Sequence, residues 1–266
     1  MTTPAVARDL LTFVEAEAEL AGKQPSEAEL WCYASSYGTV VGATFATMFP
    51  DRVGRMVLDG LLDAEQYYSN NWRDNVDQSD LAMAKFSELC HAAGSDVCSF
   101  WGPSPADITA RLDSIIHKLQ DQPIPISGVP EGMPALVTYS DFQAFLMFAI
   151  YEPLTGFPEM AEVFHQLENE NATALVGSSD RFGIVSDADQ VIRCVDSYRR
   201  NKLRTIEDFK SYADDSVALS KYLGDTWPIF SRTMLCNAFE PDLPDSMMIH
   251  GKQPLIFRSA FFMNTF

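Results

Sequence analysis

Apolar residues recur with helical spacing over the first twenty positions and are then replaced by short apolar runs. One face of the predicted helix carries Val6, Leu10, Phe13, Val14 and Leu20. Thr3 followed by Pro4 predicts the N-cap of this helix, and Gly22 predicts its end. The chain therefore begins with an amphipathic helix.

Residues 30–60 have the pattern of a strand, a tight turn, a helix and a second strand. Residues 30–33 predict a short buried strand, residues 39–49 a helix of small and apolar side chains, and residues 55–58 another buried strand. Two strands joined by a helix form a right-handed parallel unit. This pattern predicts an α/β fold with a parallel sheet.

Ser36 lies between the first strand and the helix, in the pattern Ala34-Ser35-Ser36-Tyr37-Gly38. A helix that starts so soon after a strand forces a sharp turn and exposes the residue at its apex, as in a nucleophile elbow. The backbone N–H of Tyr37, at the start of the helix, can then stabilise an oxyanion. We therefore expect Ser36 to be a nucleophile. Small residues at 34 and 38 let the two backbones pass closely.

The pattern is helical from residue 61 to about residue 240. Ser104 and Asp107 predict a helix start, and Ser140 with Gln143 predicts a capping box. Further helices are expected at residues 142–151, 158–167, 187–200 and 206–222. Residues 253–257 predict a strand that returns to the sheet, and residues 258–266 form an apolar, aromatic tail that resembles out-of-frame or unspliced translation more than a working loop.

Composition fits a globular chain and excludes some partners. The chain has 266 residues, 47% of them hydrophobic, and a formal net charge of −18. This charge argues against binding to nucleic acid or to an anionic membrane. No apolar run approaches the ~20 residues of a membrane span, and no signal peptide is visible. We expect no cofactor and no metal, since no Cys or His cluster has zinc spacing.

The stretch from Ser35 to Gly60, SSYGTVVGATFATMFPDRVGRMVLDG, resembles the tripeptidyl aminopeptidase-like α/β hydrolases of the prolyl aminopeptidase group of serine peptidases. The resemblance extends to ARDLLTFVEAEAELAGK, TYSDFQAFLMFAIYEPL and VIRCVDSYRR. It implies an α/β-hydrolase fold, a Ser–Asp–His triad and a helical cap. We expect a partial core at residues 1–62, the cap at 63–240 and a partial return to the core at 241–266. The chain is then a truncated member with an incomplete sheet.

The triad cannot be completed from the sequence. Its order in this fold is Ser, Asp or Glu, then His, and no Asp follows residue 257. His91, His117 and His165 fall in predicted cap helices, and His250 precedes the last strand. Asp59 and Asp63 are weaker candidates for an orienting acid; caps or loop solvation explain them as well. The function expected is an exopeptidase that releases short N-terminal peptides. An esterase or lactone hydrolase, with a small ester as substrate, and a catalytically inactive pseudoenzyme remain alternatives.

Five cysteines and one sequon bear on the compartment. Cys32 is expected to be a core residue. The resemblance implies the disulfides Cys90–Cys98 and Cys194–Cys236, which would point to a secreted ancestor. Four unpaired thiols in a cytosolic protein remain the alternative. Asn171 begins the sequon Asn-Ala-Thr and is a candidate for glycosylation if the protein is secreted. The oligomeric state is not predicted.

Overall fold

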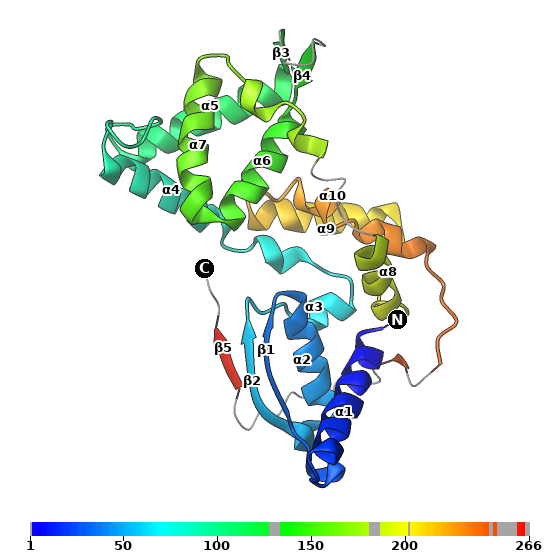
Figure 1. The fold of residues 1–266 in the computed structure, drawn as a ribbon. Coiled ribbons are helices and arrows are strands. Elements are labelled where there is room, and N and C mark those ends of the chain that lie inside the picture. Colours follow the sequence, from blue (N-terminus) through cyan, green and yellow to red (C-terminus); the bar gives the residue numbers. More distant parts are fainter. Residues whose placement is uncertain are drawn as a thin grey trace. The chain divides into compact units, whose positions relative to one another are not determined.

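The computed structural model describes residues 2–127, 134–180, 187–201, 203–244, 247–248 and 260–263 (Figure 1). The chain forms two compact units. Unit 1 comprises Met1–Asn75, Ser186–Ser211 and Ser231–Phe266, and unit 2 comprises Val76–Val185 and Tyr212–Phe230. None of the helices in the described ranges is both long enough and apolar enough to span a membrane.

Unit 1 contains a small parallel sheet. β1 (Leu30–Ser35), β2 (Val53–Asp59) and β5 (Ala260–Met263) pair in the order β1-β2-β5, and both pairings are parallel. The predicted strands at residues 30–33 and 55–58 are confirmed, and each is longer than predicted. With the surrounding helices this sheet makes a mostly helical α/β architecture, which is consistent with a hydrolase-like fold.

The third strand differs from the prediction. The predicted strand at residues 253–257 lies outside the described residues, and the structure places a strand at Ala260–Met263, inside the predicted tail. No strand was predicted for these four residues of the tail. Their backbone pairs with Met56–Asp59 of β2, about two hundred positions earlier. A four-residue apolar run becomes a strand here because a distant partner satisfies its backbone, which the local pattern cannot reveal.

Helices cover the sheet of unit 1. α2 (Tyr37–Met48) packs on β1 and β2, and α1 (Thr3–Leu20) packs against α2 (Figure 1). The buried core shared by these elements includes Ala7, Val14, Leu30, Phe45, Met56 and Leu58. α3 (Ala64–Tyr68) and α8 (Asp187–Asp196) complete the helices that bear on the site.

Gly42 sets the distance between α2 and β2. A Cβ at this position would lie 2.6 Å from Cδ2 of Leu58 and 3.3 Å from Sδ of Met56. Both side chains are buried in the core of unit 1. The absence of a side chain at residue 42 therefore lets the helix approach the strand closely.

Unit 2 is built mainly of helices around aromatic side chains. Its long helices are α4 (Ser79–Ala93), α5 (Pro105–Asp121), α6 (Tyr139–Tyr151) and α7 (Pro153–Glu168). β3 (Ile124–Ile126) and β4 (Ala135–Val137) form an antiparallel pair, α9 (Ile206–Leu219) spans the boundary in sequence between the units, and α10 (Trp227–Phe230) is short. The ring of Phe164 lies 5.5 Å from those of Phe86 and Phe100.

Two predicted caps are corrected. Thr2, rather than Thr3, caps α1, and its hydroxyl accepts from the amide of Ala5 at 3.2 Å. The hydroxyl of Thr3 is instead bonded to residues far along the chain. The capping box of α6 is formed by Thr138 and Asp141, not by Ser140 and Gln143. Both pairs have the spacing of a capping box, so spacing alone does not select between them. The predicted cap at Ser104 is confirmed.

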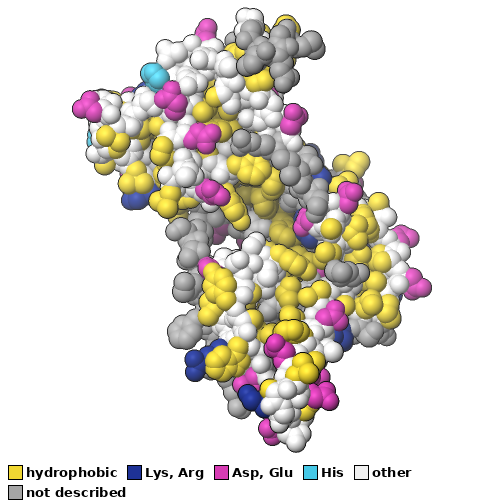
Figure 2. Space-filling view, viewed as in Figure 1, with side chains coloured by type: hydrophobic (Ala, Val, Ile, Leu, Met, Phe, Trp, Pro, Cys, Tyr) yellow, Lys and Arg dark blue, Asp and Glu magenta, His cyan; other side chains and the backbone are white. Residues whose placement is uncertain are grey.

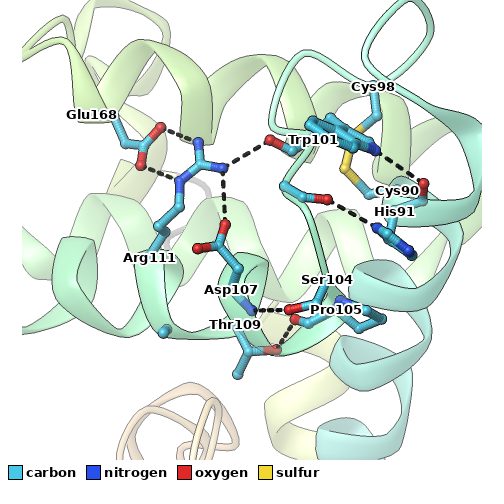
Figure 3. Close-up of polar contacts among 12 residues, drawn as sticks. Cys90, His91, Cys98, Trp101, Ser104, Pro105, Asp107, Thr109, Arg111 and Glu168 are labelled. Atoms are coloured by element: carbon cyan, nitrogen blue, oxygen red, sulfur yellow. Dashed lines mark hydrogen bonds and ion pairs between the residues drawn. A yellow bond between two sulfur atoms is a disulfide. The ribbon is translucent and has the colours of Figure 1, made fainter.

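A stapled loop connects α4 to α5 in unit 2 (Figure 3). The disulfide Cys90–Cys98 closes it, and the indole of Trp101 donates to the carbonyl of His91 at 3.1 Å. Nδ1 of His91 lies 2.9 Å from the carbonyl oxygen of Gly102. Arg111 then joins the loop to two helices through the carbonyl of Trp101 and the carboxylates of Asp107 and Glu168.

The second disulfide, Cys194–Cys236, lies in unit 1, so both expected pairings are present. Cys32 is free and half-buried, and burial raises the pKa of its thiol.

On the molecular surface, Asp and Glu side chains are scattered over the visible face and form no single patch (Figure 2).

Candidate active site

Ser36 occupies a strained turn between the end of β1 and the start of α2. Its backbone has φ 52° and ψ −126°, a conformation that costs a residue with a Cβ on the order of 1–3 kcal/mol. The Ser36 amide donates to the carbonyl of Asp59 at 3.1 Å. The Ser36 carbonyl accepts from the amide of Thr39 at 2.9 Å and from its hydroxyl at 2.6 Å. These bonds hold the side chain of Ser36 exposed at the apex, which is the geometry of a nucleophile elbow.

The residues on each side of the turn are small, and the structure shows how closely they pass. A Cβ added to Gly38 would lie 3.4 Å from Cβ of Ala34. This distance is at the short limit of ordinary van der Waals contact, so alanine is accommodated at residue 34. The close approach expected from the sequence is therefore present.

The first amides of α2 are directed away from the helix body. Tyr37 is the first residue of the helix, so its N–H has no hydrogen-bond acceptor within the helix. The amide of Thr39 is already bonded to Ser36. The Tyr37 N–H, beside the Ser36 side chain and at the positive end of the helix dipole, is thus available to an anionic oxygen.

Thr39 also ties the elbow to the loop that follows β2. Its hydroxyl, while donating to Ser36, accepts from the amide of Leu62 at 3.0 Å. In that same loop, Asp63 caps α3 by accepting from the amide of Gln66 at 2.8 Å. The carboxylate of Asp59 accepts from the hydroxyl of Tyr33, and this hydrogen bond raises the pKa of Tyr33. Asp63 thus serves as a helix cap, which was the alternative to its role as an orienting acid.

A partly buried polar network lies behind the elbow. The hydroxyls of Tyr37 and Thr3 are 2.6 Å apart, and Asp196 accepts from the amide of Thr3 at 2.9 Å, from its hydroxyl, and from the hydroxyl of Tyr67 at 2.8 Å. Burial raises the pKa of Asp196, although these hydrogen bonds oppose the rise. Burial also raises the pKa of Tyr37 and of Tyr67.

Sequence reasoning missed this network. Thr3 and Asp196 are 193 residues apart, so no local pattern joins them. The segment that contains Asp196, VIRCVDSYRR, was singled out only through the family resemblance, and no role was given to its acid. An acidic residue two positions after a disulfide cysteine was the available signal.

Three of the four histidines belong to unit 2. His91, His117 and His165 are on α4, α5 and α7 of unit 2, whereas Ser36 is in unit 1. His250 lies outside the described residues. Within the described part of the chain, no histidine forms a hydrogen bond with Ser36, and no group of three His, Cys, Asp or Glu side chains is placed to hold a metal ion.

The sequon at Asn171 follows the end of α7, and Asn171 itself is exposed. The side-chain oxygen of Asn171 accepts from the amide of Thr173 at 3.1 Å and from its hydroxyl at 2.8 Å. Its side-chain nitrogen has no hydrogen-bond acceptor among the described residues. Glycosylation at this position stays a prediction.

Two groups of curated proteins are similar to the chain. Tripeptidyl aminopeptidase of Streptomyces lividans is 33% identical, with a match that covers 95% of this chain and 47% of that protein. Serine protease Hip1 of Mycobacterium tuberculosis is 25% identical, with a match that covers 73% of this chain and 41% of that protein. The chain thus spans less than half the length of these relatives. No protein-family model matches it. Together the two relatives support a serine peptidase family for this chain.

Proposed function

We propose that the chain carries the nucleophile of an α/β-hydrolase-type serine exopeptidase that releases short peptides from the N-terminus of its substrates. The observation that carries the proposal is the strained turn at Ser36, which exposes a hydroxyl at the start of a helix that follows a parallel strand. The similarity to a tripeptidyl aminopeptidase and to a serine protease supports the reaction class. In this proposal, residues 63–240 form the cap that selects the substrate.

The proposed reaction is acyl transfer through a serine ester. Oγ of Ser36 forms a bond to the carbonyl carbon of the scissile peptide, and the Tyr37 N–H stabilises the oxyanion that develops. The Ser36 proton passes to a base and then to the leaving amine as the peptide C–N bond breaks. Water then attacks the ester, which releases the short peptide and restores the Ser36 hydroxyl. Histidine is the usual base in this chemistry.

A fluorophosphonate that carries a fluorophore tests whether Ser36 is activated. This probe phosphonylates a serine only when a base and an oxyanion site activate its hydroxyl. We expect the protein to be labelled and Ser36→Ala to abolish the labelling. Ser35→Ala is the matched control, because Ser35 is the adjacent exposed serine; this variant should label like the parent.

A parent protein that unfolds cooperatively but takes up no probe would contradict the proposal and favour a non-catalytic protein. Labelling that persists in Ser36→Ala would show that another serine is the reactive nucleophile. A tripeptide with a free N-terminus and a fluorogenic leaving amine then tests the substrate class. An exopeptidase hydrolyses it and fails on its N-acetylated form, whereas an esterase prefers a p-nitrophenyl ester.

A further inference from the structure

The carboxylate of Asp196 accepts its hydrogen bonds from hydroxyl and amide donors. It accepts from the amide and the hydroxyl of Thr3 and from the hydroxyl of Tyr67. Within the described residues, no Lys or Arg side chain forms an ion pair with it. Its position at the last residue of α8 places a negative charge at the negative end of that helix. Both burial and the helix dipole therefore act against an acid at this position.

The direction of the hydrogen bonds in the network follows from the chemistry of its members. An ionised carboxylate can only accept, so the hydroxyl of Thr3 donates to Asp196. The oxygen of Thr3 is then left to accept from the hydroxyl of Tyr37, 2.6 Å away. The chain of donors runs from Tyr37 through Thr3 to Asp196, and it begins one residue after Ser36.

The end of α8 is fixed independently of this network. Cys194, two residues before Asp196, is bonded to Cys236. The guanidinium of Arg193 donates to the carbonyl of Ser231 at 2.9 Å and lies 5.0 Å from the ring centre of Trp72. Asp196 therefore lies at a helix end that is fixed by other contacts, and Tyr37 is connected to it through Thr3.

From this arrangement we infer that Asp196 is a positioning residue, which acts through Thr3 and Tyr37 to hold the elbow of Ser36 in its catalytic conformation. The strained backbone of Ser36 persists only if surrounding contacts over-determine it. The hydroxyl of Tyr37 is one such contact, because its displacement would move the Tyr37 N–H that faces the oxyanion. The inference rests on the proposed function and names the residues that maintain it.

The test compares variants in the rate of fluorophosphonate labelling, separated into the maximal rate kinact and the binding constant KI. Tyr37→Phe removes the bond between Tyr37 and Thr3, and Thr3→Val removes that bond and the hydroxyl bond to Asp196; neither variant changes the shape of the side chain much. Removing an oxyanion donor outright lowers a rate by about 100- to 1000-fold, so displacing one should lower kinact by roughly tenfold, with KI unchanged. Asp196→Asn leaves only one side-chain oxygen to accept these hydrogen bonds, so it should lower kinact to a similar extent.

Two controls separate positioning from a loss of stability. Thr3→Ser keeps the bridging hydroxyl, so it should retain most of the parent kinact. Tyr68→Phe removes another buried hydroxyl of the same aromatic cluster, one that is bonded to Thr44 at 2.8 Å and not to Asp196. It should lower the melting temperature as much as Tyr37→Phe does, and leave kinact unchanged.

The inference is overturned if Tyr37→Phe and Thr3→Val keep the parent kinact, or if Tyr68→Phe lowers kinact equally. In either case the parent is still labelled at Ser36, so the proposed function stands. If the parent itself is not labelled, the proposed function fails, and this inference fails with it. If Asp196→Asn does not fold, the Thr3→Val and Thr3→Ser pair still decides the question.

Discussion

Asp141 shows how a buried acid is kept ionised by donors rather than by a cation. Its side chain is 5% exposed and accepts from the amide of Thr138 at 2.8 Å, from its hydroxyl at 2.7 Å, and from the amide of Ser179 at 3.1 Å. Burial alone would raise the pKa of Asp141, but the hydrogen bonds from Ser179 and Thr138 outweigh it and lower the pKa. The ionised form therefore favours the folded state.

Replacing Asp141 with Asn should destabilise the protein in a pH-dependent way. Because the folded pKa is below that of the unfolded chain, the contribution is present at neutral pH and is lost as pH falls through the folded pKa. We expect a loss of about 1 kcal/mol in unfolding free energy at pH 7, as for a lost N-terminal cap. Urea unfolding at pH 7 and at acid pH measures the change. An equal loss at both pH values would contradict this explanation.

At the scale of elements, the contact of α2 with β2 depends on one residue. Gly42 faces the buried side chains of Leu58 and Met56, and a methyl group there would lie within 2.6 Å of the first of them. A glycine inside a helix normally costs about 1 kcal/mol relative to alanine. Here the close packing that it permits offsets that cost, because Leu58 is fully buried and has little room to move.

Gly42→Ala should therefore lower stability, although alanine has the higher helix propensity. We expect a loss of about 1–3 kcal/mol, the usual effect of overpacking a core. A double-mutant cycle isolates the cause: in a Leu58→Ala background the added methyl group has room, so Gly42→Ala should be neutral or stabilising there. Denaturant unfolding of the four proteins gives the coupling. Additive effects would indicate that the contact with Leu58 is not responsible.

How far the sequence predicts these elements depends on the range of the contacts that form them. The strands β1 and β2 and the helix α2 follow from adjacent apolar runs, and the sharp turn at Ser36 follows from their spacing. The role of Thr3 depends on Asp196, and β5 depends on β2, so neither can be inferred from a short window. The cap of α6 was predicted two residues late, because two pairs of residues with the same spacing overlap there.

At the scale of the whole molecule, the two disulfides constrain the chain over different distances. Cys90–Cys98 closes a separation of 8 residues within unit 2. Cys194–Cys236 closes a separation of 42 residues and joins two segments of unit 1, between which the chain contributes Tyr212–Phe230 to unit 2. The loop closed by the second disulfide therefore contains a complete segment of unit 2, although both of its cysteines belong to unit 1.

Removing each disulfide by paired Cys→Ser substitutions should affect stability unequally. Loop-closure entropy predicts a loss of about 4 kcal/mol for Cys194–Cys236 and about 2.5 kcal/mol for Cys90–Cys98. Unfolding free energies of the two double variants, measured under non-reducing conditions, check this order. A larger loss for Cys90–Cys98 would show that local packing around the stapled loop, not chain entropy, determines its contribution.

The pairing of β2 with β5 also has a consequence for the time course of biosynthesis. β1 and β2 are both complete at residue 59, but β5 follows only after about two hundred more residues. At ~5–20 residues per second, the ribosome needs roughly 10–40 s to cover that distance. During this interval the edge of β2 that later pairs with β5 is open on the nascent chain. A chaperone that binds extended apolar segments would find its site there before translation ends.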